Sequence, residues 1–264
     1  MQLRHRVALN GAQLDELDER ILVAGVEEGA AKESVSTVSR FGGAGQRVTA
    51  CHRDTLDVVV RFGLRVKPND MAARSELFEL VMAWATNGGW LTVSYKPNRR
   101  LWVRCAQLPA AGDLVEWTSE YAITFRAYGV PYWQRAEPIY FSATGIRTVT
   151  RLLEVPGSAD TVLDVSFVNL SGMPIAAVSI SAGDSRFALQ NLGLAADEAL
   201  VIDHTAEGLL RMRIRAANGA WRSAMASRTT ESSDDLRVSP GQVNVGFTAQ
   251  RAGLLTVSCY GRYA

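Results

Sequence analysis

Leu56-Asp57-Val58-Val59-Val60-Arg61-Phe62-Gly63-Leu64-Arg65-Val66-Lys67 carries the clearest secondary-structure signal in the chain. Its apolar side chains recur at every second position, and Asp57, Arg61 and Arg65 occupy positions between them. Successive side chains of a β-strand point to opposite faces, so this period of two predicts a long strand that is buried on one face.

The period changes immediately after this segment. Pro68-Asn69-Asp70 interrupts the alternation and offers Asp70 as a helix N-cap, and Asn87-Gly88-Gly89 offers a stop. Between them the apolar positions follow helical spacing: Leu77, Phe78, Val81, Trp84 and Ala85. The pattern predicts a helix over about 69–87. No other long segment has this period, so the predicted fold is mainly β with one principal α-helix.

Further strands follow the helix. Residues 90–95 and 101–108 flank the turn Lys96-Pro97-Asn98-Arg99 and predict a hairpin, and residues 121–127 alternate again. The pattern then breaks at Gly129-Val130-Pro131-Tyr132-Trp133. We place a domain boundary there, which predicts domains at 1–132 and 133–264. A single large β domain is the alternative at this chain length.

The second half contains many short alternating segments separated by turn residues. They are Leu163-Val165-Phe167, Val178-Ile180, Phe187-Leu189, Val201-Ile202, Met212-Ile214, Val243-Val245-Phe247 and Leu255-Val257-Cys259. Closely spaced short strands without a convincing helix predict a sandwich or a barrel.

The stretch from about 27 to 50 is rich in Gly, Ser and Ala and lacks strong periodicity. We expect an extended loop or arm there, outside the core. Such arms often reach a neighbouring subunit, and Phe41, Gln46 and Arg47 are the candidate contact residues. The glycines nearby do not satisfy GxxxxGK[ST], so flexibility explains them better than phosphate binding.

Composition excludes several classes of function. Lys and Arg total 28 against 27 Asp and Glu, and a net charge of +1 gives no general attraction to nucleic acid or anionic lipid. The longest apolar runs are far too short to span a membrane, and no apolar segment follows the charged N-terminus. We therefore expect a protein that folds in a cytoplasm, without membrane or nucleic-acid binding.

Motifs for catalysis or metal binding are missing. His5, His52 and His204 have no HxxxH or HExxH spacing, GxSxG is absent, and the three cysteines lack CxxC spacing. The cysteines are best interpreted as small core residues. Acidic clusters at 15–19 and 234–235 select no carboxylate pair for glycoside hydrolysis. We predict no catalytic residue, no metal and no cofactor.

Two polar patterns in the second half could bind a ligand. Asn218, Trp221 and Arg222 place an aromatic ring beside hydrogen-bonding groups near a turn, which is the chemistry of a sugar platform and also of an ordinary hairpin with a packed Trp. Arg211, Arg213 and Arg215 share one strand face. That stripe could meet an acidic partner or phosphate, although a solvated sheet face is the commoner explanation.

Taken in order, these features resemble the distal tail protein of long-tailed, non-contractile bacteriophages. The similarity covers nearly the whole chain, but each motif alone is a strand or turn that other β proteins could share. In the first half it rests on 9–11, 17–23, 53–62, the helix at 74–84, 88–91 and 131–133, and in the second half on 200–203, 232–236, 240–245 and 257–263.

The resemblance implies an N-terminal split-barrel-like domain with one helix and a C-terminal galectin-like β-sandwich. It implies a structural virion protein, commonly a hexameric ring, at the distal end of the tail, assembled in the host cytoplasm. The implied partners are the tail tube protein, the tail-associated hub protein and, in some phages, receptor-binding or other baseplate proteins. The His, Asn, Arg and Trp constellation of sugar-binding galectins is not found in order.

Other functions remain as alternatives. A carbohydrate-binding β-sandwich that recognises the host surface is the first, and a secreted glycosidase is the second, which the missing signal peptide opposes. A contractile-tail relative or another tube protein is a structural variant of the same hypothesis.

Overall fold

The structure is a computed structural model that describes residues 5–39, 46–67, 69–109 and 120–264. The chain divides into two compact units, Met1–Trp133 and Gln134–Ala264. Strand β9 (Trp133–Arg135) contains the division, beside the boundary that the sequence predicts after residue 132.

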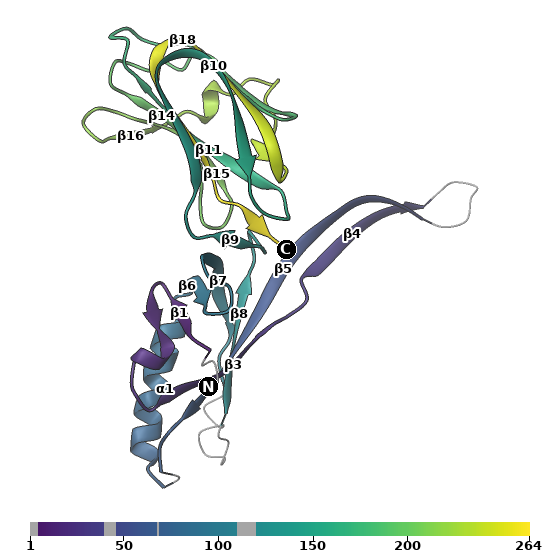
Figure 1. The fold of residues 1–264 in the computed structure, drawn as a ribbon, viewed down its shortest axis with the longest axis vertical. Helices are drawn as coiled ribbons and strands as arrows, with labels where there is room; N and C mark the ends of the chain where they lie inside the picture. The colour runs from purple at the N-terminus through teal and green to yellow at the C-terminus, as the bar shows by residue number, and fades with distance from the viewer. Residues whose placement is uncertain (1–4, 40–45, 68, 110–119) are drawn as a thin grey trace. The chain divides into compact units, whose positions relative to one another are not determined.

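The first unit is built on one antiparallel sheet whose strands run in the order β2-β1-β6-β7-β8-β5-β3 (Figure 1). Their bounds are β1 Val7–Leu9, β2 Ala12–Gln13, β3 Ile21–Glu28, β5 Gln46–Leu64, β6 Gly89–Val93, β7 Arg99–Gln107 and β8 Tyr121–Ala127. A short 3-10 helix, Leu14–Glu16, follows β2. Strand β4 (Lys32–Ser39) pairs with β5.

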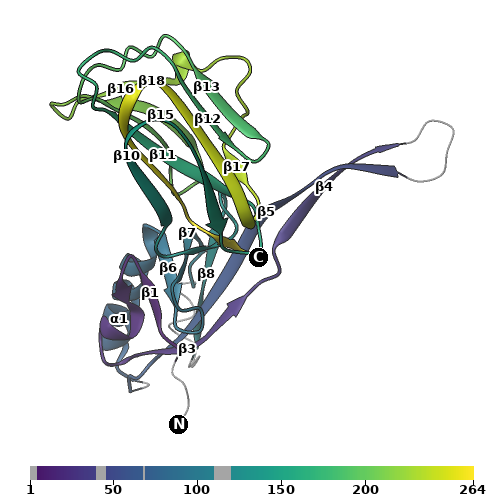
Figure 2. The ribbon, with the colours of Figure 1, turned by 45° about the horizontal axis from the view of Figure 1, so that its top comes forward.

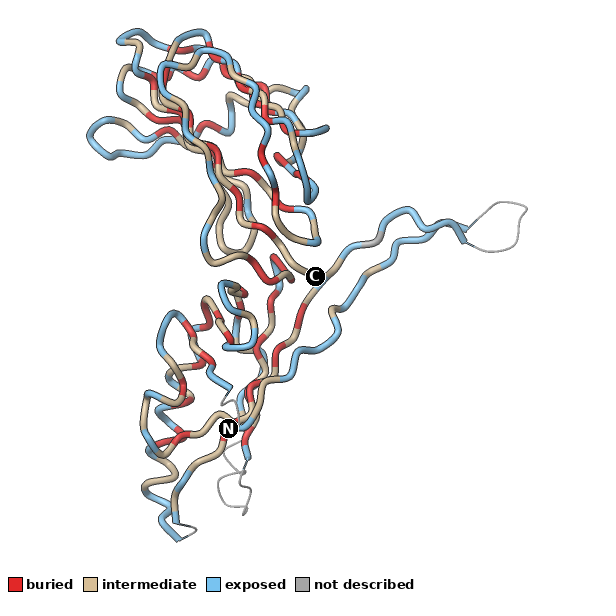
Figure 3. Tube along the Cα trace, viewed as in Figure 1, coloured by how far each residue is buried: buried red, intermediate tan, exposed pale blue. Residues whose placement is uncertain are grey.

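Residues 56–64 of the alternating segment form the second half of β5, which lies between β8 and β3 in the sheet and is buried on one face, as predicted. Leu56, Val58, Val60 and Phe62 of β5 are all buried, and β8 beside it buries every second residue in the same way (Figure 3). The strand ends at Leu64 and not at Lys67, because the backbone turns there and the Val66 N–H donates to the Leu64 carbonyl.

Helix α1 (Met71–Thr86) covers the apolar face of the sheet. Asp70 caps its N-terminus by accepting a hydrogen bond from the Ala73 N–H at 3.1 Å, which satisfies one of the free donors of the first turn. Its buried side chains are those that the helical spacing predicts: Leu77, Phe78, Val81 and Ala85. Trp84 packs edge-on against Phe125 of β8, with 5.8 Å between the ring centroids.

The hairpin predicted between 90 and 108 is strands β6 and β7, with Leu91 opposite Leu101. Asn98 adopts φ 59° in the turn. Asn tolerates this left-handed conformation better than other non-glycine residues, because its short side chain can hydrogen-bond locally.

The second unit is a β-sheet that folds over on itself into two layers (Figure 2). The strand order is β13-β12-β18-β11-β14-β15-β16, with β10 along β18 and β17 along β11. The bounds are β10 Ile139–Val155, β11 Thr161–Asn169, β12 Val178–Ala182, β13 Ser185–Leu189, β14 Ala199–His204, β15 Leu210–Arg215, β16 Trp221–Ser223, β17 Arg237–Val238, β18 Gly241–Cys259 and β19 Arg262–Tyr263. A 3-10 helix spans Met225–Ser227.

Strand β18 joins the two layers. Its first half pairs with β12 and its second half pairs with β11, while β10 follows it along the other edge. The core lies between the layers, where the rings of Phe167 and Phe247 have centroids 4.7 Å apart. The sequence pattern predicts two separate strands at 243–247 and 255–259, and this is wrong because both belong to the single strand β18.

The predicted fold class is confirmed. The described residues contain one α-helix, and strands dominate both units in a manner consistent with a galectin-like sandwich in the second. None of the described helices is long and apolar enough to cross a membrane.

Candidate functional site

The predicted arm is a long β-hairpin, not an extended loop. Strand β4 pairs with the first part of β5 from Lys32 opposite Thr55 to Ser39 opposite Gln46, and Figure 1 shows the two strands leaving the sheet of the first unit together. Weak hydrophobic periodicity hid these strands, because a hairpin that is exposed on both faces needs no apolar alternation. The hairpin is held by its backbone ladder.

Exposed valines distinguish the two faces of this hairpin. Val35 and Val48 are 53% and 57% exposed and lie on one face, since Val48 is paired with Thr37, two residues from Val35. Val38 is 57% exposed and points to the opposite face. Isolated exposed apolar residues are common, but three on one two-stranded ribbon outside a core favour an interaction surface.

The three predicted arm contacts have different outcomes. Phe41 lies outside the described residues. The side chain of Gln46 accepts a hydrogen bond from the Thr37 hydroxyl at 2.8 Å, so it links the two strands. Arg47 is exposed, and its guanidinium has no ion-pair partner within the part of the chain that the structure describes.

The base of the hairpin is fixed by charge pairs on the sheet. Arg126 of β8 makes a bidentate ion pair with Asp57 of β5, at 2.5 and 2.8 Å. Hydrogen bonds from Arg126 lower the pKa of Asp57, because they favour its ionised form. Four residues further along β5, Arg61 binds Glu27 of β3 at 2.9 Å. These pairs tie β3, β5 and β8 together where β5 leaves the sheet.

The arginine stripe of β15 is largely neutralised within the protein. Arg211 makes a bidentate pair with Asp203 of β14, at 3.0 and 2.6 Å, and Arg213 binds the same carboxylate at 3.0 Å. Met212 and Ile214 are buried on the other face, as the alternation predicts. Arg215 is exposed and has no partner among the described residues.

The candidate sugar residues lie on and before β16. Asn218 accepts a hydrogen bond from the Ala220 N–H at 3.0 Å and so shapes the turn. Arg222 binds the Gly193 carbonyl and Glu198, both at 2.7 Å. Trp221 is 48% exposed, and the guanidinium of Arg213 lies 4.3 Å from its ring centroid. A shallow depression of about 350 Å³ adjoins Trp221 and Arg213.

Two of these three side chains therefore already have intramolecular roles, and Arg213 occupies one face of the Trp221 ring. A stacked sugar would have to use the other face. Asn218, Trp221 and Arg222 stay a prediction for carbohydrate contact.

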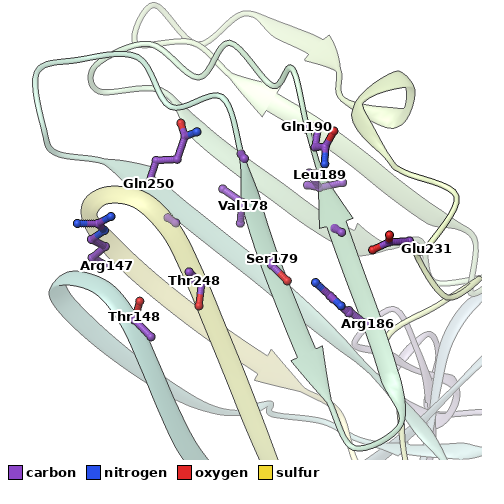
Figure 4. A pocket seen from close by; sticks show the side chains of 13 residues that line it. Arg147, Thr148, Val178, Ser179, Arg186, Leu189, Gln190, Glu231, Thr248 and Gln250 are labelled. Carbon is purple, nitrogen blue, oxygen red and sulfur yellow. The ribbon is translucent and has the colours of Figure 1, made fainter.

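A wider groove, which the sequence did not reveal, lies on the outer face of the second unit. It has a volume of about 580 Å³ and crosses strands β10, β18, β12 and β13. Its floor is formed by residues that are paired across these four strands: Thr148, Thr248, Ser179 and Ala188. Figure 4 shows the first three of them. We call it the hydroxyl groove. Its residues are scattered from 147 to 250, and no local motif could have signalled it.

Both ring nitrogens of His204 contact a carboxylate. Its Nδ1 lies 2.8 Å from Asp164 and its Nε2 lies 2.8 Å from Asp235. Burial disfavours the charged ring, but the hydrogen bonds to the two carboxylates outweigh it and raise the pKa of His204 to about 9. Both nitrogens are occupied, so the ring cannot activate a nucleophile. The described residues contain no His, Cys, Asp and Glu group suited to a metal.

The cysteines do not share an environment. Cys259 is buried in the core of the second unit, and burial raises the pKa of its thiol to about 12. Cys105 is half-buried on β7, and burial raises its pKa as well. The core interpretation is therefore right for Cys259 and only partly right for Cys105. The side chain of Cys51 lies outside the described residues.

No family model matches this chain, and no curated protein matches its sequence. The fold, however, matches solved structures over nearly its whole length. The Dit protein of phage SPP1, described as a paradigm of the hub adsorption apparatus in phages that infect Gram-positive hosts, aligns with a TM-score of 0.68 and 14% identity. The alignment covers 98% of this chain and 99% of that chain.

A chain of the phage P2 baseplate in its activated conformation with Ca aligns with a TM-score of 0.52 and 6% identity, and covers 99% of this chain and 98% of the other. At these sequence identities, both matches are similarities of fold. The sequence indicates a resemblance to distal tail proteins, and the fold match, which extends through both units, confirms that resemblance for the fold.

Proposed function

We propose that this protein is a structural component of a bacteriophage tail that forms a ring, with six subunits by family analogy, at the distal end of the tail. The ring would join the tail tube to the baseplate or tail tip. The observation that carries the proposal is the match to the SPP1 Dit protein through both units and nearly the full length of both chains. A single shared sandwich would be weak support, because one fold hosts many functions.

The exposed hairpin adds independent support. Ring closure by cyclic symmetry needs heterologous contacts, in which one patch of a subunit meets a different patch of its neighbour. The hairpin has eight paired positions and projects from its own sheet, and among the described residues no third strand pairs with this part of β4 and β5. A neighbouring subunit is the partner that a ring would supply.

The remaining partners follow from the same analogy. They are a tail tube protein on one side of the ring, a tail-associated hub protein on the other, and receptor-binding or further baseplate proteins at the periphery. The site chemistry supports a structural role, because His204, Arg211 and Arg213 are engaged in bonds within the protein.

Mass photometry and negative-stain imaging of the purified full chain test the proposal. The expected result is a closed ring with a central hole and a mass near six subunits. A strictly monomeric chain at micromolar concentration would contradict self-assembly, and a compact dimer without a hole would contradict the ring.

A shortened hairpin tests the role of the arm. Replacing residues 34–52 with Asn-Gly keeps Glu33 opposite Arg53 and closes the hairpin with a tight two-residue turn. We expect this variant to keep the folded stability of the first unit and to lose the ring. An unchanged ring would show that the arm makes no subunit contact.

A further inference from the structure

The hydroxyl groove has a floor of small side chains and walls of long polar ones. The floor residues Thr148, Thr248 and Ser179 present hydroxyl groups in one row across three strands, and Ala188 continues the row on β13. In the adjacent row Gly246 lies against Ser181, and a Cβ on Gly246 would come within 2.6 Å of the Ser181 oxygen. Because Gly246 has no side chain and Ser181 has a small one, no large side chain projects from the sheet beside the row.

The walls carry charge and amide groups. Figure 4 shows Arg147 on one side of the row and Arg186 on the other, on the same side as Glu231. Among the described residues, neither guanidinium has an ion-pair or hydrogen-bond partner. This differs from Arg211, Arg213, Arg222 and Arg228 of the same unit, whose guanidinium groups all bind carboxylates.

This combination defines the chemistry of a ligand. Hydroxyl groups both donate and accept hydrogen bonds, and they match the hydroxyls of a polyol or a sugar. The groove has two unpaired guanidinium groups, those of Arg147 and Arg186, and one carboxylate, that of Glu231, so its net positive charge favours an anionic ligand. A guanidinium group binds a carboxylate or a phosphate through two parallel hydrogen bonds. The volume of about 580 Å³ lies in the range of roughly 300–1,000 Å³ that is typical of ligand sites.

A peptide fits the groove less well. Strands β18 and β12 are paired on both sides, so their backbone groups cannot bind an added strand. The apolar residues that border the groove, such as Val178 and Leu189, are buried and point into the core, so the floor offers no pocket for an apolar anchor.

We propose that the hydroxyl groove binds an anionic polyhydroxylated chain, such as an acidic saccharide or a polyol phosphate. The floor hydroxyls bind the hydroxyls of the chain, and Arg147 and Arg186 bind successive anionic groups. This site is distinct from the Trp221 depression, which lies over β15 and β16. The proposal does not depend on ring formation, since every residue that carries it belongs to one unit of one chain.

Isothermal titration of the full chain tests the proposal. Three probes are saccharides or polyols: a uronic-acid oligosaccharide, a glycerol-phosphate oligomer and a neutral dextran oligosaccharide. A fourth probe is a peptide. Binding of either anionic probe at least tenfold tighter than the neutral one is expected, and which of the two binds identifies the source. An aspartate-rich peptide is the competing macromolecular class. Equal binding of the peptide, equal binding of dextran, or no binding of any probe at millimolar concentration would overturn the proposal.

Matched variants locate the site. Arg186→Gln and Arg147→Gln should each weaken binding of the anionic probe about tenfold. Arg215→Gln removes an exposed, unpaired charge outside the groove and should change binding less than twofold. Thr248→Val should weaken binding several-fold, and Thr150→Val, on the same sheet face but outside the groove, should not. An equal loss in the Arg215 variant would mean nonspecific attraction and would contradict the site.

Discussion

The side-chain amide of Asn10 forms hydrogen bonds to the backbone on both sides of Gly89. The Asn10 Nδ2 donates to the Gly88 carbonyl at 3.0 Å, and its Oδ1 accepts from the Trp90 N–H at 2.9 Å. Gly89 has φ 139°, and a Cβ there would lie 2.1 Å from the Asn10 side chain. The two short motifs near 10 and 89, which are far apart in sequence, thus form one contact where the helix ends and β6 begins.

Asn10→Gly should lower the free energy of unfolding of the first unit by about 1–3 kcal/mol, because the hydrogen bonds with the Gly88 carbonyl and the Trp90 N–H are both lost. Glycine is chosen because Asn10 has φ 52°, which glycine tolerates. Urea titration followed by tryptophan fluorescence measures the change, since Trp90 lies at the contact. A variant as stable as the parent would show that the amide is dispensable.

Gly89→Ala should destabilise the first unit more than Gly11→Ala does. Both positions have positive φ, so alanine is strained at each, but the space beside Gly11 is open whereas Gly89 faces Asn10. The clash with Asn10 adds to the backbone strain only at Gly89, and urea titration measures the difference between the two variants. Equal losses of stability would contradict the close packing.

Gly253→Ala tests how β18 passes over the core of the second unit. A Cβ on Gly253 would lie 2.3 Å from the Val168 carbonyl and 2.5 Å from the Phe167 ring. The expected cost is about 1–3 kcal/mol, the usual range for overpacking. Gly172→Ala, in open space, is the control for an added methyl group, although its positive φ adds strain. Circular dichroism during urea unfolding reports both, and a loss in Gly253→Ala no larger than in the control would be contrary to expectation.

The bonds of His204 predict a stability that depends on pH. Its pKa is raised from the ordinary value of about 6.5 to about 9, so its contribution is fully present below pH 6.5 and is lost as the pH rises through 9. At 1.36 kcal/mol per pKa unit the loss is on the order of 3 kcal/mol. Urea midpoints of the second unit should therefore fall between pH 6.5 and 9.

The variant His204→Asn should lack this fall. It should be less stable than the parent at pH 6 and should approach it near pH 10, because the neutral imidazole has lost much of its advantage there. Parallel curves for the two proteins across this range would show that another group is responsible.

How much of this was visible in the sequence depends on burial. The strand at 56–64, the helix and its Asp70 cap all left periodic marks, because one face of each is buried against a core. The hairpin at 32–55 left none, since its exposed faces place no constraint on polarity. The same reason hid β10, of which only the last part buries side chains such as Leu153 and Val155.

The candidate sites were harder to predict, because they depend on register across strands. Trp221 was visible as an aromatic near a turn, but the position of Arg213 over its ring depends on the pairing of β15 with β16. The row formed by Thr148, Thr248 and Ser179 exists only through the registers of β10, β18 and β12. Single Ser and Thr residues in strands give no such signal.

The valines of the hairpin give the sharpest test of the proposed assembly. Val35 and Val48 form the more apolar face, whereas Val38 on the other face lies among polar residues such as Ser34 and Ser36. If the apolar face meets a neighbour, each valine buried there contributes about 1.5–3 kcal/mol to the contact. The double variant Val35→Ser/Val48→Ser should then shift the mass distribution from rings to smaller species at micromolar concentration. Val38→Ser should leave the rings largely intact, and rings lost only in Val38→Ser would place the contact on the opposite face.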